Sequence, residues 1–309
     1  MIGARLLLSA LALAGLVALP AAAHESAWTA GNTAPSARSE SGIAVTGGRA
    51  YIIGDYNDAT DVLVYDLARA SWQVAPGFPY RVHHPMAAGL DGKVYVFGGY
   101  VGNWEVTAKS WVLDPEAGTW RPIADLPSGR AAGAAVAIGD RIYVIGGSRA
   151  GAVNVPDVDV YTPATDTWSA LAPLPTPRDH LSAGAIAGRI VVAGGRIDGD
   201  PAHNLAVTEI YDPATDSWAA APGMPTPRSG AAAAVLDGKL FVMGGETRTE
   251  VFDAVEAFDL ASGRWQSYPP LPTPRHGFGA AAFDGHIVTL TGSPEAGGGK
   301  SGTVEILAP

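Results

Sequence analysis

A unit of roughly 44 to 50 residues is written six times along this chain, and this repetition constrains the fold more than any other feature. In the fourth copy, residues 188–229, a β-rich run ends in a Gly pair, a second run carries Tyr-Asp, and a Trp and a Thr-Pro-Arg follow: Gly194-Gly195, Tyr211-Asp212, Trp218 and Thr226-Pro227-Arg228. A repeat of this length built from short strands predicts a radial β-array in which each unit packs only against its neighbours.

Tryptophan marks the copies most clearly. The repeat tryptophans are Trp28, Trp72, Trp120, Trp168, Trp218 and Trp265. We expect each of them to be the large apolar group at the interface between two units. An Arg follows each Trp by nine or ten residues: Arg38, Arg81, Arg130, Arg178, Arg228 and Arg275. Apart from Arg81, we expect these arginines to be structural, with guanidinium groups that bind carbonyl oxygens where two units meet.

Four strands fit each unit, as the third copy shows. Strand a is the small-residue run 131–138, and Gly139-Asp140 forms a two-residue hairpin turn. Strand b, residues 141–147, is apolar without alternation, which indicates burial on both faces. Strand c carries Tyr161 and strand d carries Trp168. We expect the Gly pair that ends strand b to let a neighbouring ring approach the backbone closely.

The series of Gly-Gly, Tyr-Asp, Trp and Pro-x-Pro-Arg resembles the kelch repeat, and the resemblance covers residues 24–309. It implies an all-β fold: a six-bladed kelch-type β-propeller with four antiparallel strands in each blade. The last copy ends at its strand c, residues 304–307, without a Trp, whereas Trp28 stands alone at the start. We therefore expect the N-terminal strand to complete the last blade and close the ring, which removes edge strands.

The first 23 residues do not belong to the repeat. Arg5 precedes the apolar run 6–19, and Ala21-Ala22-Ala23 resembles a small-residue cleavage site. This pattern predicts a secretory signal peptide, residues 1–23, that is cleaved before His24. A membrane anchor is the alternative, but the run is short for a span. We expect the domain at residues 24–309 to be periplasmic or secreted.

Charge and cysteine content narrow the partners and cofactors. The formal net charge is −10, which disfavours nucleic acids and anionic membranes as partners. The chain has no Cys, so it forms no disulfides and lacks the Cys–Tyr cross-link that accompanies copper in galactose oxidase-like propellers. We expect no cofactor, no bound metal and a monomer.

The two faces of such a propeller differ in their loops. The a–b and c–d turns repeat almost unchanged, which indicates a structural face. The b–c loops share the other face with the d–a links between blades, and their sequences differ from copy to copy: 55–58, 100–105, 148–157, 196–204, 246–250 and 293–300. Binding residues favour variable loops on a rigid scaffold. We therefore predict the site at the mouth of the central channel on this face.

Histidines and acids gather where strand a begins. Counted back from the a–b turn, two columns emerge, the first with Glu40, His84 and His180 and the second with His83, Asp179 and His276. His203 adds to them from a b–c loop. Such groups can bind a polar ligand or transfer protons near neutral pH, with Glu40, His84 and His180 as the catalytic candidates. The alternative is that they serve local hydrogen bonds, and no spaced metal-binding motif is present.

Trp104 and three arginines complete the candidate binding residues. Trp104 lies in a b–c loop, where an indole can stack on a sugar ring or a cation; the alternative is that it folds back over its own blade. Arg149, Arg196 and Arg248 lie on b–c loops outside the repeat pattern and are candidates for holding a carboxylate.

Two functions follow from the resemblance. The first is a module that binds a glycan, a small molecule or a protein through the b–c loop face and the channel mouth. The second is a periplasmic sugar isomerase, since sialic acid mutarotases are similar single propellers. Anomer exchange needs a proton acceptor, a proton donor and, for an acidic sugar, an arginine; His180, His84, Glu40 and Arg196 are the candidates. Whether the protein is an enzyme stays open at this point.

Overall fold

The computed structural model describes residues 27–150 and 152–309, which form six four-stranded antiparallel sheets. Blades 1 to 3 consist of β2 (Gly42–Thr46), β3 (Arg49–Ile53), β4 (Val62–Asp66), β5 (Ser71–Ala75); β6 (Met86–Leu90), β7 (Lys93–Phe97), β10 (Ser110–Asp114), β11 (Thr119–Ile123); and β12 (Ala134–Ile138), β13 (Arg141–Ile145), β16 (Val158–Thr162), β17 (Thr167–Ala170). Blades 4 to 6 consist of β18 (Ser182–Ile186), β19 (Arg189–Ala193), β20 (Thr208–Asp212), β21 (Ser217–Ala221); β22 (Ala232–Leu236), β23 (Lys239–Met243), β24 (Val255–Asp259), β25 (Arg264–Tyr268); and β26 (Gly279–Phe283), β27 (His286–Leu290), β28 (Val304–Leu307), β1 (Trp28–Ala30). Two b–c loops form hairpins, β8 (Tyr100–Val101) with β9 (Glu105–Val106) and β14 (Ser148–Arg149) with β15 (Val153–Asn154), and a third contains the 3-10 helix η1 (Pro201–His203).

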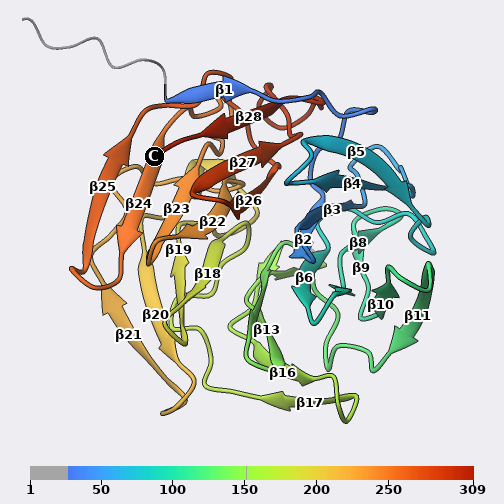
Figure 1. Cartoon of the computed structure of the whole chain (residues 1–309). Helices are drawn as coiled ribbons and strands as arrows, with labels where there is room; N and C mark the ends of the chain where they lie inside the picture. The colour runs from blue at the N-terminus through green and yellow to red at the C-terminus, as the bar shows by residue number, and fades with distance from the viewer. Residues whose placement is uncertain (1–26, 151) are drawn as a thin grey trace, which may run out of the picture.

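The blades surround a central axis in chain order, and the two ends of the chain meet in one blade (Figure 1). Strand β1 pairs with β28, with Trp28 opposite Leu307, so the N-terminal strand completes the last blade. This confirms the predicted six-bladed all-β propeller and its closure. The innermost strand of each blade is rich in Ala and Gly, and these strands line a channel of about 450 Å³.

A closed ring of backbone hydrogen bonds joins all six blades near the axis. In each blade one residue ahead of strand a adopts a positive φ between 50° and 65° and donates its N–H to the carbonyl of the preceding ring residue, at N···O distances of 2.7 to 3.1 Å. The ring residues are Glu40, His84, Ala132, His180, Gly230 and Gly277. The left-handed conformation favours Gly, so a Glu and two His in it are unusual.

The Gly pairs at the ends of the b strands form a second belt between blades. The second Gly of each pair donates its N–H to the carbonyl of the next blade's repeat Arg, as Gly99 does to Arg130 at 3.0 Å. A Cβ on the first Gly, Gly98, would lie 2.2 Å from that carbonyl oxygen, and Gly98 has a φ of 58°. The pair therefore accommodates a neighbouring carbonyl group, and the expected close approach of a ring is found at Gly244, where a Cβ would lie 2.7 Å from the Phe278 ring.

The repeat tryptophans form an outer belt. Each donates its indole N–H to a carbonyl in the link of an adjacent blade, as Trp168 does to Ala124 at 2.9 Å. The acceptors of the other five are carbonyls of Pro269, Asn32, Pro76, Ala172 and Pro222. Trp28 is buried, whereas the other five are partly exposed. The tryptophans thus seal the rim between blades and do not form the centre of each interface.

Buried ion pairs accompany the repeat arginines. Arg178 is fully buried and donates to Glu209 at 2.6 Å and to the carbonyl of Gly194 at 2.7 Å. The same buried pairing recurs at other junctions, with Arg130 on Asp159, Arg228 on Glu256 and Arg275 on Glu305, whereas Arg38 pairs with the half-exposed Asp61. These arginines are structural, as predicted from the sequence, but the acidic partners were not foreseen.

Arg81 is not part of this series. Its side chain is 70% exposed and lies 3.5 Å from Asp58, whereas the neighbouring Val82 is buried and accepts the inter-blade hydrogen bond that the other blades give to an Arg. The repeat position in this copy therefore belongs to Val82, and the prediction that assigned it to Arg81 was wrong by one residue. Val82 stands ten residues after Trp72, which restores the regular interval.

The predicted signal peptide, residues 1–23, and its cleavage site lie outside the described residues. Among the residues that the structure does describe, none forms a helix long and apolar enough to cross a membrane.

Replacing Trp168 tests the outer belt. We expect Trp168→Phe to lower the free energy of unfolding by about 1 kcal/mol, because a ring remains but the hydrogen bond to Ala124 is lost. We expect Trp168→Ala to lower the free energy of unfolding by about 2 to 3 kcal/mol. This is less than the loss expected for a fully buried Trp, because the ring is partly exposed. Denaturant unfolding measures both, with Val74→Ala, at a position 62% exposed, as the control. Wild-type stability of Trp168→Ala would contradict this role.

Candidate functional site

A pocket of about 220 Å³ lies at the mouth of the channel on the b–c loop face, and we call it the channel-mouth pocket. Its lining comes from the ring, from the residues that precede ring positions and from five b–c loops: Ser39, Glu40, Tyr56, His84, Trp104, Arg196, Gly199, Pro201, Glu246, His276, Gly297 and Gly298. Glu40 and His84 also line the narrow space on the other side of the ring. The floor of the pocket is therefore the ring itself.

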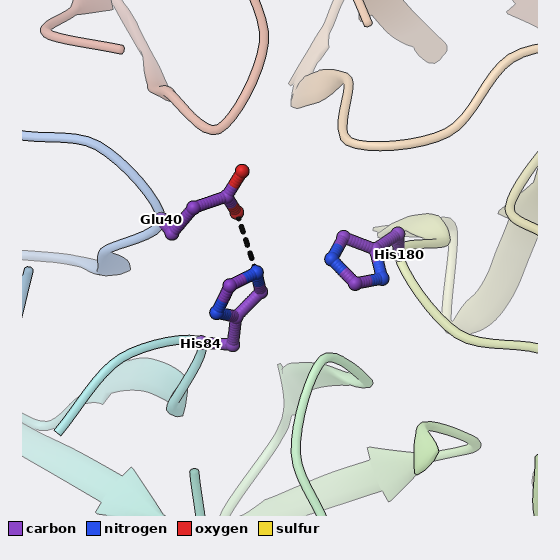
Figure 2. A group of neighbouring side chains, drawn as sticks. All are labelled: Glu40, His84 and His180. Atoms are coloured by element: carbon purple, nitrogen blue, oxygen red, sulfur yellow. Dashed lines mark ion pairs between the residues drawn. The ribbon is translucent and has the colours of Figure 1, made fainter. Parts of the chain in front are cut away.

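Three ring residues direct polar side chains toward the axis. Glu40, His84 and His180 start from different blades and point toward one another (Figure 2). Their positive φ angles, 54°, 52° and 50°, are imposed by the ring hydrogen bonds and set the direction in which each side chain leaves the backbone. The other ring positions carry Ala132, Gly230 and Gly277 and leave space beside these three.

Glu40 is the centre of one hydrogen-bonded chain. Its two carboxylate oxygens accept hydrogen bonds from His84 Nε2 at 2.9 Å and from His276 Nε2 at 3.1 Å. His276 Nε2 also lies 3.5 Å from Glu246. Burial raises the pKa of Glu40, but His84 and His276 hold it well below its usual value, so Glu40 is a carboxylate. Burial lowers the pKa of His276, but Glu40 and Glu246 raise it above its ordinary value, which favours the imidazolium.

His180 belongs to a second chain. Its Nδ1–H donates to Asp179 at 2.5 Å, and its Nε2 accepts from an Arg196 amino group at 3.0 Å. Arg196 also donates to Glu246 at 2.7 Å, and Asn154 donates to Asp179 at 2.6 Å. Burial and the Arg196 guanidinium lower the pKa of His180, so the ring is neutral. Because both ring nitrogens have partners, His180 does not serve as a proton acceptor in this arrangement.

Aromatic rings form one wall of the pocket. Trp104 is 50% exposed and Tyr56 is 38% exposed, with ring centroids 5.8 Å apart at 61°. Trp104 also packs against Tyr100 and His83 of its own blade, at 5.0 and 4.8 Å. Trp104 therefore folds back over its own blade and also faces the pocket. From the sequence alone, these two positions were alternatives. Burial, with a smaller contribution from His84, lowers the pKa of His83 to about 4.

Five of the residues proposed from the sequence line the pocket: Glu40, His84, Trp104, Arg196 and His276. His83, Asp179 and His180 lie directly behind them, through the contacts above. Arg149, His203 and Arg248 lie outside. Arg149 pairs with Asp157 at 2.8 Å, Arg248 pairs with Asp200, and the half-exposed His203 lies 3.4 Å from Asp198.

Sequence reasoning missed Glu246 and Tyr56. Glu246 comes directly after Gly244-Gly245, at the same offset as Arg196 in the preceding blade, and both form a bridge with the residue before the ring position. Comparing the residues that follow each Gly pair would have identified Glu246 together with Arg196. Tyr56 gave no such signal, because its loop replaces the Gly pair with Gly54-Asp55.

Within the described part of the chain, two groups of residues bring possible metal ligands within 4.8 Å of one another: Glu40 with His84 and His180, and Glu40 with Glu246 and His276. In the first group, the His180 nitrogen nearest the cluster accepts a hydrogen bond from Arg196, so a cation there would meet a guanidinium. In the second group, His276 already donates to Glu40. Hydrogen bonds among protein groups therefore account for both arrangements.

Comparison with protein families matches residues 87–292 to the model of the KLHDC2/KLHL20/DRC7 Kelch-repeats domain. Among curated proteins, the chain is similar to Kelch-like protein terF of Aspergillus terreus, with 30% identity over 110 residues, 32% of this chain and 24% of that protein. It is also similar to an F-box/kelch-repeat protein of Arabidopsis thaliana, with 30% identity over 86 residues, 26% of this chain and 25% of that protein. The chain thus spans about a quarter of the length of these relatives.

Among solved structures, the chain resembles the structure of YjhT with a TM-score of 0.79 at 16% identity, over 90% of this chain and 96% of that one. At this identity the likeness concerns the fold alone. It places both chains in the same propeller architecture and says nothing about the pocket.

Gly277 and Gly230 test how the ring positions Glu40. A Cβ at Gly277 would lie 2.5 Å from Glu40 Oε1, whereas a Cβ at Gly230 would meet nothing closer than 3.6 Å. Both positions have a positive φ, so both Ala variants carry the same backbone strain of about 1 to 2 kcal/mol. We expect Gly277→Ala to displace the Glu40 carboxylate and to lower the pKa of His276, and Gly230→Ala to leave that pKa unchanged.

NMR titration of the histidine ring protons measures this pKa. Because its folded-state value lies above its unfolded value, near 6.5, His276 stabilises the fold below that pH. This stabilisation is lost as the pH rises through the folded-state pKa, and Gly277→Ala should remove the pH dependence. If the pKa of His276 is the same in Gly277→Ala and Gly230→Ala, the proposal that Gly277 positions Glu40 is refuted.

Proposed function

This chain belongs to the kelch-repeat family of β-propellers, and on that basis we propose that it is a binding module whose ligand occupies the channel-mouth pocket. Kelch propellers generally bind proteins or ligands. The observation that carries the proposal is the convergence of buried hydrogen-bonding groups and half-exposed aromatic rings on one pocket, where Glu40, His276 and Arg196 form the floor and Trp104 the wall.

The size and lining of the pocket favour a small, hydroxyl-rich ligand such as one sugar ring. Its volume of about 220 Å³ is below the range of roughly 300 to 1,000 Å³ of pockets for drug-sized ligands. Sugars combine hydroxyl groups, which match carboxylates and imidazoles, with an apolar ring face, which matches an indole. A protein could also contact the wider loop face, but a pocket with a charged floor suits a ligand small enough to enter it.

The place of action follows from the N-terminal sequence alone. The apolar run and the small residues after it support export, so we propose that the protein meets its ligand in the periplasm or outside the cell.

Thermal unfolding against a panel of neutral, amino and acidic sugars tests the binding proposal. A sugar present at about 100 times its dissociation constant should stabilise the fold by about 2.7 kcal/mol and raise the unfolding midpoint by several degrees. We expect Trp104→Ala to abolish the shift and His203→Ala, on the same face but outside the pocket, to retain it. A shift that survives Trp104→Ala would place the ligand elsewhere, and no shift with any sugar would contradict the sugar proposal.

A second candidate function, anomer exchange of a sugar, is favoured by the acid and base on the pocket floor. The Glu40 carboxylate can accept the proton of the anomeric hydroxyl while the His276 imidazolium donates a proton to the ring oxygen. The bond between the anomeric carbon and the ring oxygen then breaks to give the open-chain aldehyde, and closure on the other face reverses the transfers. A neutral sugar fits this scheme better than sialic acid, because Arg196 is already paired with Glu246 and Asp179.

Anomer exchange can be followed by NMR after a pure anomer is dissolved. If the protein is a mutarotase, it should accelerate equilibration over buffer, and Glu40→Gln should lower that acceleration by at least a hundredfold. His203→Ala is the control and should retain it. An equilibration rate equal to that in buffer would leave binding as the function of the pocket and exclude mutarotation of the sugars tested.

A further inference from the structure

The arginines of the loop face are already paired with carboxylates. Arg149 lies against Asp157, Arg248 against Asp200, and Arg196 against both Glu246 and Asp179. These are the three residues that the sequence offered for an anionic ligand. Because each guanidinium has an acidic partner, a ligand carboxylate would have to displace a protein carboxylate to reach it. The charges on this face therefore do not favour an acid.

The pocket floor instead has an excess of acidic groups. Glu40 and Glu246 each place a carboxylate oxygen within 4.8 Å of the other and of a His276 nitrogen. The carboxylates of Glu40, Glu246 and Asp179 share His276 and Arg196 as partners, and Glu40 also accepts a hydrogen bond from His84. A further positive charge at the floor would balance this arrangement, and a further negative charge would oppose it.

His276 supplies a second observation that points to a ligand at the floor. It is 2% exposed, and its Nδ1 has no hydrogen-bond partner among residues 27–150 and 152–309. An imidazolium there carries a buried N–H without an acceptor, which is unfavourable. A ligand cation that takes over the interaction with Glu40 and Glu246 lets His276 release that proton and become neutral.

The wall of the pocket also suits a cation. Tyr56 and Trp104 expose ring surface in the same pocket as the carboxylates, and their rings meet at 61°. Aromatic faces attract ammonium groups, and the attraction is strongest for Trp. A carboxylate floor and an aromatic wall thus favour the same charge, while the apolar face of a sugar ring can lie against the indole.

We propose that the ligand of the channel-mouth pocket is an amino sugar, whose ammonium group lies between the carboxylates of Glu40 and Glu246 and whose ring lies against Trp104. The inference rests on the proposed binding function and adds the charge of the ligand to it. An ammonium group has three N–H donors, so it can contact both carboxylates at once.

Three sugars that share a ring but differ in charge test the proposal. Isothermal titration with glucosamine, N-acetylglucosamine and glucuronate compares an ammonium, a neutral amide and a carboxylate. We expect glucosamine to bind at least tenfold more tightly than N-acetylglucosamine, and glucuronate to bind most weakly. Equal binding of the first two, or tighter binding of glucuronate, would overturn the inference while leaving the proposed function intact. Binding of none of the three would overturn both.

Variants locate the charge dependence. We expect Glu246→Gln and Glu40→Gln each to weaken glucosamine binding at least tenfold more than they weaken N-acetylglucosamine binding. Glu250→Gln, an exposed position on the same loop as Glu246 and outside the pocket, is the matched control and should bind glucosamine as the wild type does. Circular dichroism establishes that each variant is folded. Because two Gln variants are compared, the test can still be made if one of them does not fold. Unchanged glucosamine binding in both Gln variants would refute the assignment.

Discussion

The closed ring of six backbone hydrogen bonds around the axis is the constraint on which the rest of the structure depends. Each blade contributes one residue whose N–H and C=O both serve the ring, and this requires a left-handed backbone at every position. Gly230 and Gly277 adopt it at little cost, but Ala132, Glu40, His84 and His180 do so against their preference. The ring therefore holds three polar side chains at the axis, and two of them, Glu40 and His84, line the channel-mouth pocket.

Outside the ring, two kinds of arginine have different roles. The repeat arginines are buried between blades and neutralised by acids on strand c, as with Arg178 and Glu209. Removing either partner would leave an uncompensated buried charge, so these pairs belong to the scaffold. Arg196 lies in the pocket but is held by acids from two blades, Asp179 and Glu246. Its role is to orient His180 and Glu246, which leaves the carboxylates and the aromatic wall to meet a ligand.

The repeat allowed the fold to be predicted almost completely from the sequence. Its period and strand signals are local, and the position of Trp28 ahead of the first copy was enough to predict how the ring closes. The pocket was predicted in part: the columns that contain Glu40, His84 and His276 follow from counting within the repeat. Partners across blades could not be predicted in this way, because the contact of Glu246 with Arg196 depends on loop conformation. The same holds for Arg248, which Asp200 of the preceding blade neutralises.

The most direct test of this account is an NMR map of sugar binding on the folded protein, with glucosamine as the probe. The account predicts that the largest chemical-shift changes fall on the Trp104 indole, the rings of His84 and His276 and the amides of Gly277 and Gly297, all at the channel mouth. Changes confined to the a–b and c–d turns on the opposite face, or no changes at millimolar sugar, would contradict the claim that the ring of the propeller forms the floor of a ligand site.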